Sequence, residues 1–288
     1  MAQKRTSLVM LTPALLILGV FLLIPIASGF YMSLEQTSLS GVTRFVGFEN
    51  YRLLLFEGQR ILTNLRVSLS YVLANIMLTI PFAYLIAILV TRNSALARFF
   101  RSLYLIPWIC APVVSTLMVR SMLDPEMGII HLMVKYISGG DVFILNNGTY
   151  ALLVMILHSF WRSCPFIMLF LSAGMSTIPN EFYEAATIDG AGKIKSFFHL
   201  TLPLTSNQLC IGVLMVTIWT IQDSESVYAL TRGGPGYSTE TLAVRLFKSS
   251  FVNFDLNSGA VIGIFLIILS LIFMTLYLKI LLKGDLYG

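Results

Sequence analysis

Long apolar runs separated by polar segments recur along the chain. A helix of about 20 apolar residues is long enough to cross the roughly 30 Å hydrocarbon core of a bilayer. Six runs fit this template, the fifth of them short, and they cover residues 7–32, 67–90, 102–123, 150–172, 208–222 and 258–282. The pattern therefore predicts an all-α integral membrane protein with six transmembrane helices, which form a single domain over residues 1–288.

The composition supports a membrane location. Of the 288 residues, 57% are hydrophobic and 11% are charged, and the mean hydropathy is +0.83. A water-soluble domain of this composition would expose large apolar patches. The net charge of +5 is scattered over the loops and forms no basic stripe with interleaved aromatic residues. We therefore expect membrane lipid, and not nucleic acid, as a partner.

Lysine and arginine indicate how the chain is oriented, because they are enriched in cytoplasmic segments. With the N-terminus inside, the inner segments hold Lys4, Arg5, Arg92, Arg98, Arg101, Lys193, Lys195, Lys279 and Lys283. The outer loops hold a similar number over roughly twice the length. Both termini are therefore expected in the cytoplasm. The first apolar run is longer than the roughly 7 to 15 residues of a secretory leader, which favours an uncleaved first span.

Residue types that carry catalysis or bind metals are dispersed along the chain. They are Cys110, Cys164, Cys210, His131, His158 and His199. None has a partner at metal-ligand or catalytic spacing, so no active site, metal or cofactor is expected. Residues 190–193 are similar to the end of a phosphate-binding loop, but Thr187 stands at its first glycine and Ile194 at its final Ser or Thr. The chain is therefore not expected to bind ATP.

The fourth and fifth runs contain polar side chains within predicted spans, where the bilayer favours apolar ones. A charge at the centre of a span costs about 2.5 to 3.5 kcal/mol on insertion scales, so such residues are candidates for function. In the fifth run, Thr220 and Asp223 lie three residues apart, next to Trp219. Aromatic, hydroxyl and carboxylate groups together suit a sugar, which has an apolar ring face and a rim of hydroxyls.

Arg162 is the charged residue of the fourth run, followed directly by Ser163. A buried guanidinium favours an anionic solute through bidentate hydrogen bonds, and it could equally pair with Asp223 or Glu225. The sequence leaves both interpretations open.

About 30 residues connect the fourth and fifth runs, whereas helix connections usually need 2 to 8. Ser176 or Thr177 can cap a helix there, the glycines after Asp189 allow a turn, and a second helix can follow until Pro203. The alanine pair Ala185-Ala186 permits close approach of another backbone, and Glu184 offers a carboxylate. The helix pair could enter a cleft in a partner or simply cap the bundle.

The polar segments on the outer side are expected to be loops. Residues 138–141 are rich in turn formers, and the successive Gly and Pro of residues 231–236 predict a tight reversal. After that reversal, Leu242, Leu246 and Phe247, with Phe251 four residues on, share one face of a predicted surface helix. That helix could cover the bundle, dock a soluble partner, or do both.

The connection between the fourth and fifth runs resembles a family signature. Glu184-Ala185-Ala186, then Gly190 after three residues, then Leu200-Thr201-Leu202-Pro203 after nine, is similar to the cytoplasmic loop of membrane subunits of bacterial binding-protein-dependent ABC importers. Leu200 stands where that pattern usually has Ile. Further segments resemble the maltose-permease-like carbohydrate branch of this family, namely 46–51, Ile106-Pro107-Trp108 and 231–235.

The resemblance implies a type I importer fold in the bacterial cytoplasmic (inner) membrane. The loop at about 176–203 would be the coupling helix region that docks in an ATPase. Its contact residues would be Glu184, Ala185, Ala186, Asp189 and Gly190. A second homologous permease and two ATP-binding subunits would complete the transporter, so the chain itself would not be an enzyme. A periplasmic or lipid-anchored solute-binding protein would deliver the solute.

By the same resemblance, Trp108, Ser163, Phe166, Thr220 and Asp223 occupy positions that line a mid-membrane solute site. With Arg162 and Trp219 they form the expected substrate-binding set. We interpret the chain as an importer permease for a carbohydrate or an acidic derivative. One alternative is a polyol or glycerophosphate importer permease. An ion-coupled secondary transporter would need inverted repeats, which the sequence lacks, and a channel or sensor would leave the Glu184 loop without a partner.

Overall fold

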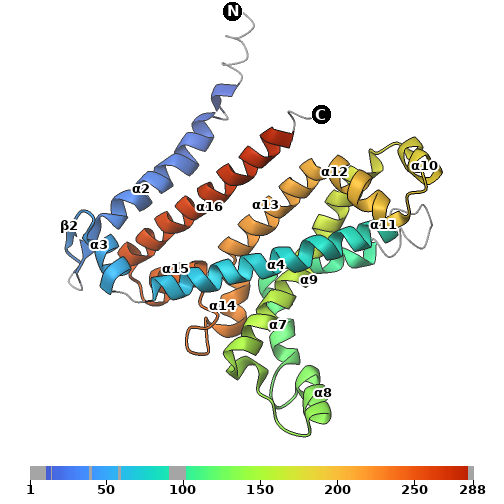
Figure 1. The fold of residues 1–288 in the computed structure, drawn as a ribbon. Coiled ribbons are helices and arrows are strands. Elements are labelled where there is room, and N and C mark those ends of the chain that lie inside the picture. The colour runs from blue at the N-terminus through green and yellow to red at the C-terminus, as the bar shows by residue number, and fades with distance from the viewer. Residues whose placement is uncertain (1–10, 14, 39–40, 58–59, 91–101, 285–288) are drawn as a thin grey trace, which may run out of the picture. The chain divides into compact units, whose positions relative to one another are not determined.

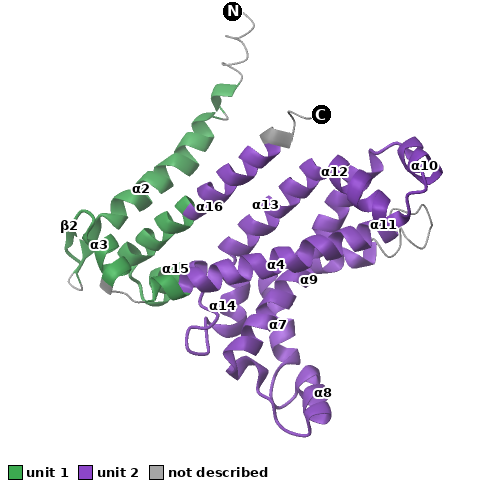
Figure 2. Cartoon of the chain, viewed as in Figure 1, with its two compact units in different colours: residues 1–63, 245–268 green, residues 64–244, 269–288 purple. Residues whose placement is uncertain are grey.

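The computed structural model describes residues 11–13, 15–38, 41–57, 60–90 and 102–284. The chain divides into two compact units, each assembled from separate segments of the sequence (Figure 2). Unit 1 comprises residues 1–63 and 245–268, and unit 2 comprises residues 64–244 and 269–288. The single permease domain stays a prediction. Part of the basis for the predicted orientation, Lys4, Arg5, Arg92, Arg98 and Arg101, lies outside the described residues.

Helices dominate the described chain and confirm the all-α membrane fold. Four of them are long and apolar enough to cross a bilayer: Leu11–Ser33, Ile61–Leu89, Gly148–Ser176 and Leu256–Leu281. Two helix pairs qualify as well when each pair is taken as one bent span. They correspond to the third and fifth predicted runs, so each of the six apolar runs is helical over the residues that the structure describes.

The two bends are features that the sequence pattern did not predict. Ser102–Ile109 and Pro112–Met122 meet at 97°, because Ala111 takes the extended backbone favoured before a proline. Lys193–Leu204 and Ser206–Gln222 meet at 76°. The second bend explains why the fifth apolar run is short.

Unit 1 contains a small β-hairpin that was predicted only as an irregular loop. Strands β1 (Glu35–Thr37) and β2 (Thr43–Phe45) pair antiparallel, with Gln36 opposite Arg44. Asn50 of α3 (Glu49–Arg52) donates hydrogen bonds to the carbonyls of Ser33 and Glu35, at 2.9 and 2.7 Å. The unit also holds α2 (Ile24–Ser33), π-helical turns at Gly19–Leu23, Leu53–Glu57 and Lys248–Val252, and the first part of α16 (Leu256–Gly284).

Unit 2 is built around the long helix α9, whose buried residues Ile167, Met168 and Leu171 pack between α4 and α13. Asn147 caps α9, accepting hydrogen bonds from the amides of Thr149 and Tyr150, so the helix begins two residues before the predicted span. Figure 1 shows the helices of this unit: α4 (Ile61–Val90), α6 (Ile106–Ile109), α7 (Pro112–Met122), α8 (Ile129–Ser138), α9 (Gly148–Ser176), α10 (Asn180–Ile188), α11 (Lys193–Ser196), α12 (Leu202–Leu204), α13 (Ser206–Gln222), α14 (Glu225–Thr231) and the start of α15 (Leu242–Phe247).

The connection between α9 and α13 is a helical hairpin, as predicted, but its cap differs. Ser176 and Thr177 do not cap α10, because α9 runs past its predicted end and their hydroxyls donate back to its carbonyls. Pro179 precedes α10 instead. Gly190 has a φ of +76°, which confirms the turn. Helix α11, a π-helical turn at Phe197–Thr201 and α12 then continue to Leu204, one residue beyond Pro203.

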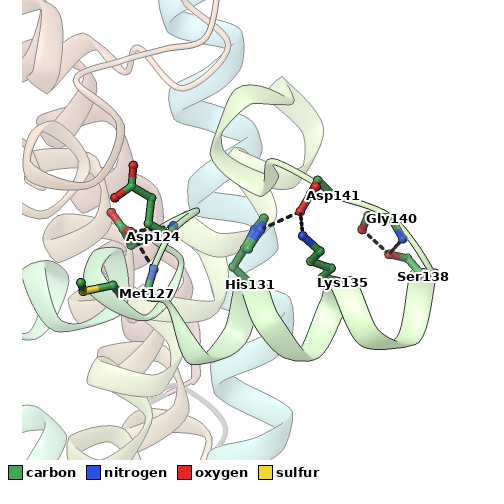
Figure 3. Close-up of polar contacts among 8 residues, drawn as sticks. Asp124, Met127, His131, Lys135, Ser138, Gly140 and Asp141 are labelled. Carbon is green, nitrogen blue, oxygen red and sulfur yellow. Dashed lines mark hydrogen bonds and ion pairs between the residues drawn. The ribbon is translucent and has the colours of Figure 1, made fainter.

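The segments predicted to be outer loops contain helices that the sequence pattern missed. Helix α8 follows α7 and is closed by the predicted turn, with Gly139 at a φ of +71°. His131 and Lys135 of α8 both point at Asp141 (Figure 3). The reversal at 231–236 is confirmed, with Gly233 at a φ of +85°. In the helix that follows, α15 continues into the π-helical turn at Lys248–Val252, the rings of Phe247 and Phe251 lie 5.3 Å apart, and Phe251 is 64% exposed.

Candidate functional site

A cleft of about 450 Å³ opens in unit 2, where α6, α9, α13 and α14 meet. Its lining comprises Trp108, Cys110, Pro112, Ser159, Arg162, Ser163, Trp219, Thr220, Gln222, Asp223, Ser224 and Glu225. The structure thus brings together six of the seven residues expected to bind substrate. The seventh, Phe166, contacts two of them but is not part of the lining.

Helix α9 supplies one wall of the cleft. Ser159, Arg162, Ser163 and Phe166 follow the 3- and 4-residue spacing of a single helix face. The opposite wall begins where α13 ends, since Asp223 leaves the helical conformation with a ψ of 87°. Where a helix is interrupted, backbone groups as well as side chains can line the cleft.

Three aromatic side chains form one cluster beside the cleft. Trp108 stacks on Phe166 with ring centroids 4.8 Å apart, and Phe166 meets Trp219 edge-on at 5.2 Å. Phe166 therefore holds the two tryptophans in place. Trp108 is 42% exposed and lines the cleft, so its ring can receive the apolar face of a solute.

Hydroxyl groups on the cleft wall are oriented by a buried network from α4. The amide of Asn75 donates to Ser159 Oγ and to Thr220 Oγ1, each at 2.7 Å. Thr79 donates to Asn75 Oδ1 at 2.9 Å, and its hydroxyl lies 3.4 Å from that of Ser163. Asn75 and Thr79 are fully buried. The network joins α4, α9 and α13 and fixes the directions of the lining hydroxyls.

Asp223 is bound on both carboxylate oxygens by the protein itself. The Tyr71 hydroxyl donates to Oδ2 at 3.2 Å, and the backbone amide of Ser226 donates to Oδ1 at 3.0 Å. The residue is only 8% exposed. The second bond places this carboxylate at the start of α14, where a negative charge is favourable.

Arg162 has no comparable partner. Its side chain is half-buried and lines the cleft, and it forms no ion pair with Asp223, Glu225 or any other carboxylate in the part of the chain that the structure describes. The internal pairing left open by the sequence is therefore not made. A guanidinium in a cleft favours an anionic ligand, which it can bind through two parallel hydrogen bonds.

The polar face of α4 escaped the sequence reasoning. It runs along the helix through Asn64, Ser68, Tyr71, Asn75 and Thr79, all buried. Near the start of α4, Asn64 donates to the carbonyl of Glu240 at 2.7 Å, and Ser68 Oγ accepts from the amide of Leu242 at 2.9 Å. The signal was available, because these residues recur every three or four positions within an apolar run. It is weak because uncharged polar residues are less unusual within a span than charged ones.

The residues expected to contact an ATPase lie together on α10 and the turn that follows. Glu184, Ala185, Asp189 and Gly190 are exposed, and Ala186 is half-buried. Their role stays a prediction. Among the described residues, no three His, Cys, Asp or Glu side chains converge as a metal site would require.

Comparison with known proteins places this geometry in a family context. A family model described as "Binding-protein-dependent transport system inner membrane component" matches residues 61–283. The sulfoquinovosyl glycerol transport system permease protein SmoG of Agrobacterium fabrum is 28% identical, over 99% of this chain and 93% of the relative.

Two further relatives have similar coverage. The trehalose/maltose transport system permease protein MalF of Thermococcus litoralis is 27% identical, over 96% of this chain and 94% of its own. The sn-glycerol-3-phosphate transport system permease protein UgpA of Rhizobium meliloti is 28% identical, over 90% and 88%.

A similar solved structure is a crystal structure of a bacterial ABC transporter involved in the import of the acidic polysaccharide alginate. It matches with a TM-score of 0.83 and 16% identity, covering 98% of this chain and 96% of that chain. At this identity the similarity shows the fold.

Proposed function

Because the chain belongs to the family of binding-protein-dependent transport system inner membrane components, we propose that it is the subunit through which an ATP-driven importer moves a carbohydrate or carbohydrate derivative bearing an anionic group. Membership makes the chain a multi-pass membrane subunit of a transporter supplied by a binding protein. The type I importer permease fold expected from the sequence is confirmed. The solute, its contacts and the energy source are the proposed part.

The solute class is supported by the relatives and by the lining of the cleft. Relatives are named for trehalose and maltose, for sulfoquinovosyl glycerol and for sn-glycerol-3-phosphate. Such solutes need an apolar surface and several hydrogen-bonding groups. Here Trp108 and Trp219 offer the first, and Ser159, Ser163 and Thr220 offer the second.

The anionic group is supported by a single observation, that Arg162 has no ion-pair partner among the residues that the structure describes. A charge held away from bulk water is costly unless it is paired. The charge of Asp223 is already stabilised by Tyr71 and Ser226. A carboxylate, sulfonate or phosphate on the solute would complete the coordination of Arg162, and a glycerophosphate meets the same requirement.

A neutral carbohydrate or polyol is the second candidate, and Glu225 favours it. This carboxylate is exposed and lines the same cleft, so it offsets the charge of Arg162 at longer range. The first candidate requires a negatively charged solute, and the second requires a neutral one. Arg162→Gln and Glu225→Gln therefore form a matched pair of neutralising variants.

The test is uptake by the assembled transporter in vesicles, at saturating loaded binding protein, for an anionic sugar and its neutral analogue. A charge-assisted hydrogen bond is worth about 1.5 to 3 kcal/mol, so Arg162→Gln should slow anionic uptake roughly ten- to hundredfold and leave neutral uptake nearly unchanged. Glu225→Gln should not slow anionic uptake. The proposal is wrong if Arg162→Gln spares the anionic solute and abolishes uptake of the neutral one.

The partners follow from the chain's own chemistry. It has no complete phosphate-binding loop, so separate ATP-binding subunits supply the energy, and a second homologous permease completes the pathway. The exposed carboxylate of Glu184 and the small side chain of Ala185 suit α10 to a cleft in an ATP-binding subunit. ATP-driven closure of those subunits would move α10 as a rigid body and open the spans outward. Both termini would be cytoplasmic.

A further inference from the structure

The helix that runs from Lys193 to Leu204 carries a surface that no other described part of the chain covers. Ile194 and Phe198 lie one turn apart and are 77% and 57% exposed. With Lys193, Lys195 and His199 they line a shallow apolar surface. Neither lysine forms an ion pair with a residue that the structure describes.

Two residues beside this surface fix the helix to the bundle. Phe197 meets the ring of Tyr84 edge-on at 5.5 Å, and Thr201 shares a 3.1 Å hydrogen bond with Tyr183 of α10. Ile194 and Phe198 stay exposed although Phe197 and Thr201, next to them on the helix, hold it to the bundle. The exposed side is therefore a constant feature of the helix and not a result of fraying.

The helix lies across the direction of the span that follows it. Lys193–Leu204 meets Ser206–Gln222 at 76° (Figure 1). Since α13 crosses the membrane, a helix almost perpendicular to it runs along the membrane surface. An apolar row flanked by basic side chains is the pattern of a helix that lies in the lipid interface.

Charge divides the helical hairpin into two halves. Residues 180–189 contain Glu181, Glu184 and Asp189 and no Lys or Arg, whereas residues 190–204 contain Lys193, Lys195 and His199 and no Asp or Glu. A leaflet of anionic phospholipid attracts the second half and repels the first. Long lysine side chains can also lay their apolar stems on lipid while the charge reaches the headgroups.

We propose that this basic half binds the anionic phospholipids of the cytoplasmic leaflet. Lys193 and Lys195 contact the phosphate headgroups, and Ile194 and Phe198 insert among the upper acyl chains. The acidic helix α10 is then left to bind the ATP-binding subunit. The proposal rests on the cytoplasmic placement of this loop in the proposed function.

The experiment places a photo-reactive p-benzoylphenylalanine at Phe198, and in a matched control at Phe182 of α10, which is 50% exposed. The assembled transporter is irradiated in vesicles of equal phosphatidylglycerol and phosphatidylcholine, and adducts are identified by mass. The Phe198 probe should yield phospholipid adducts enriched in phosphatidylglycerol, by about fivefold for each lysine. Adding Lys193→Gln and Lys195→Gln should abolish that enrichment while lipid adducts persist.

Two results would overturn the lipid proposal. One is adducts of the Phe198 probe with an ATP-binding subunit. The other is equal labelling of both lipids by the Phe198 probe while Lys193 and Lys195 are unchanged. The Phe182 probe separates this failure from failure of the proposed function. It should label an ATP-binding subunit, and its failure to do so would count against the coupling role whatever the Phe198 probe shows.

Discussion

The side chain of Asn75 connects three helices through one amide group. It donates to Ser159 of α9 and Thr220 of α13 and accepts from Thr79 on its own helix. All four residues are buried, and buried polar groups are normally hydrogen-bonded, so a lost bond here is costly. The direction of the cleft hydroxyls thus depends on a residue that does not line the cleft.

Asn75→Ala is predicted to destabilise the protein by about 2 kcal/mol or more, because it leaves buried hydroxyls without partners. The control is Met77→Ala, two residues away on a side chain that is 73% exposed. Denaturant unfolding of the full chain in micelles, followed by tryptophan fluorescence, measures both. Equal losses would show that Asn75 contributes packing alone.

Asp141 holds helix α8 through charge, and this contact predicts a pH dependence. Its Oδ1 lies 2.7 Å from Lys135 Nζ and 3.5 Å from His131 Nε2 (Figure 3). The hydrogen bond from Lys135 lowers the pKa of the Asp141 carboxyl below its usual value. The fold therefore favours the charged form, so the contribution is present above the ordinary pKa of about 3.9 and is lost as pH falls through the lowered value.

Amide hydrogen exchange over α8, corrected for its intrinsic pH dependence, should rise as the pH falls from about 5 to about 3. Asp141→Asn should remove most of this dependence and leave exchange raised at neutral pH. If Asp141→Asn showed the same dependence of exchange on pH as the wild-type protein, the assigned contact would be contradicted.

At the scale of elements, α9 and α13 approach closely at Gly174. A Cβ at this position would lie 2.6 Å from Gln208 Cγ, which is too short for any real contact. Gly29, in the helix α2, has nothing within 4 Å of the same position. Two helical glycines thus differ only in whether a neighbouring helix needs the space.

Gly174→Ala is therefore predicted to destabilise by about 1 to 3 kcal/mol through overpacking. Gly29→Ala should be neutral or stabilising by up to about 1 kcal/mol, since alanine is the better helix former. Unfolding midpoints of the two variants test this directly. Shifts of the same sign would mean that α9 and α13 do not pack as described.

The apolar runs predict the helices because the length of a span is set by the bilayer itself. They do not predict the bends at Ala111 and Thr205, since a bent helix and a straight one share the same composition. The hairpin β1–β2 and helix α8 were missed because short elements carry weak periodic signals and depend on tertiary contacts.

The cleft was predictable to the extent that charge and aromatic residues are unusual within spans. Arg162, Trp219 and Asp223 stand out in the sequence on that ground. Asn75 and Thr79 do not, because uncharged polar residues cost less in a span and find partners only when helices pack. Asn75 and Thr79 are distinguished only by the hydrogen bonds that they make between helices.

For the whole molecule, the central claim is that transport through this chain is driven by ATP on other subunits. Family membership and the exposed helix α10 support it, and the proposed function assigns the coupling contact to Glu184. An ion-coupled carrier would use the same cleft without needing α10. The source of energy therefore separates the two accounts more cleanly than the identity of the solute.

Solute uptake into vesicles that contain the chain, its partner permease and the ATP-binding subunits is the most direct test. Uptake should require ATP and loaded binding protein and should persist when ion gradients are collapsed. Glu184→Lys should abolish uptake, and the control Glu126→Lys, at an exposed carboxylate of a predicted outer loop, should not. Uptake driven by an ion gradient without the ATP-binding subunits, or normal uptake by Glu184→Lys, would contradict the account.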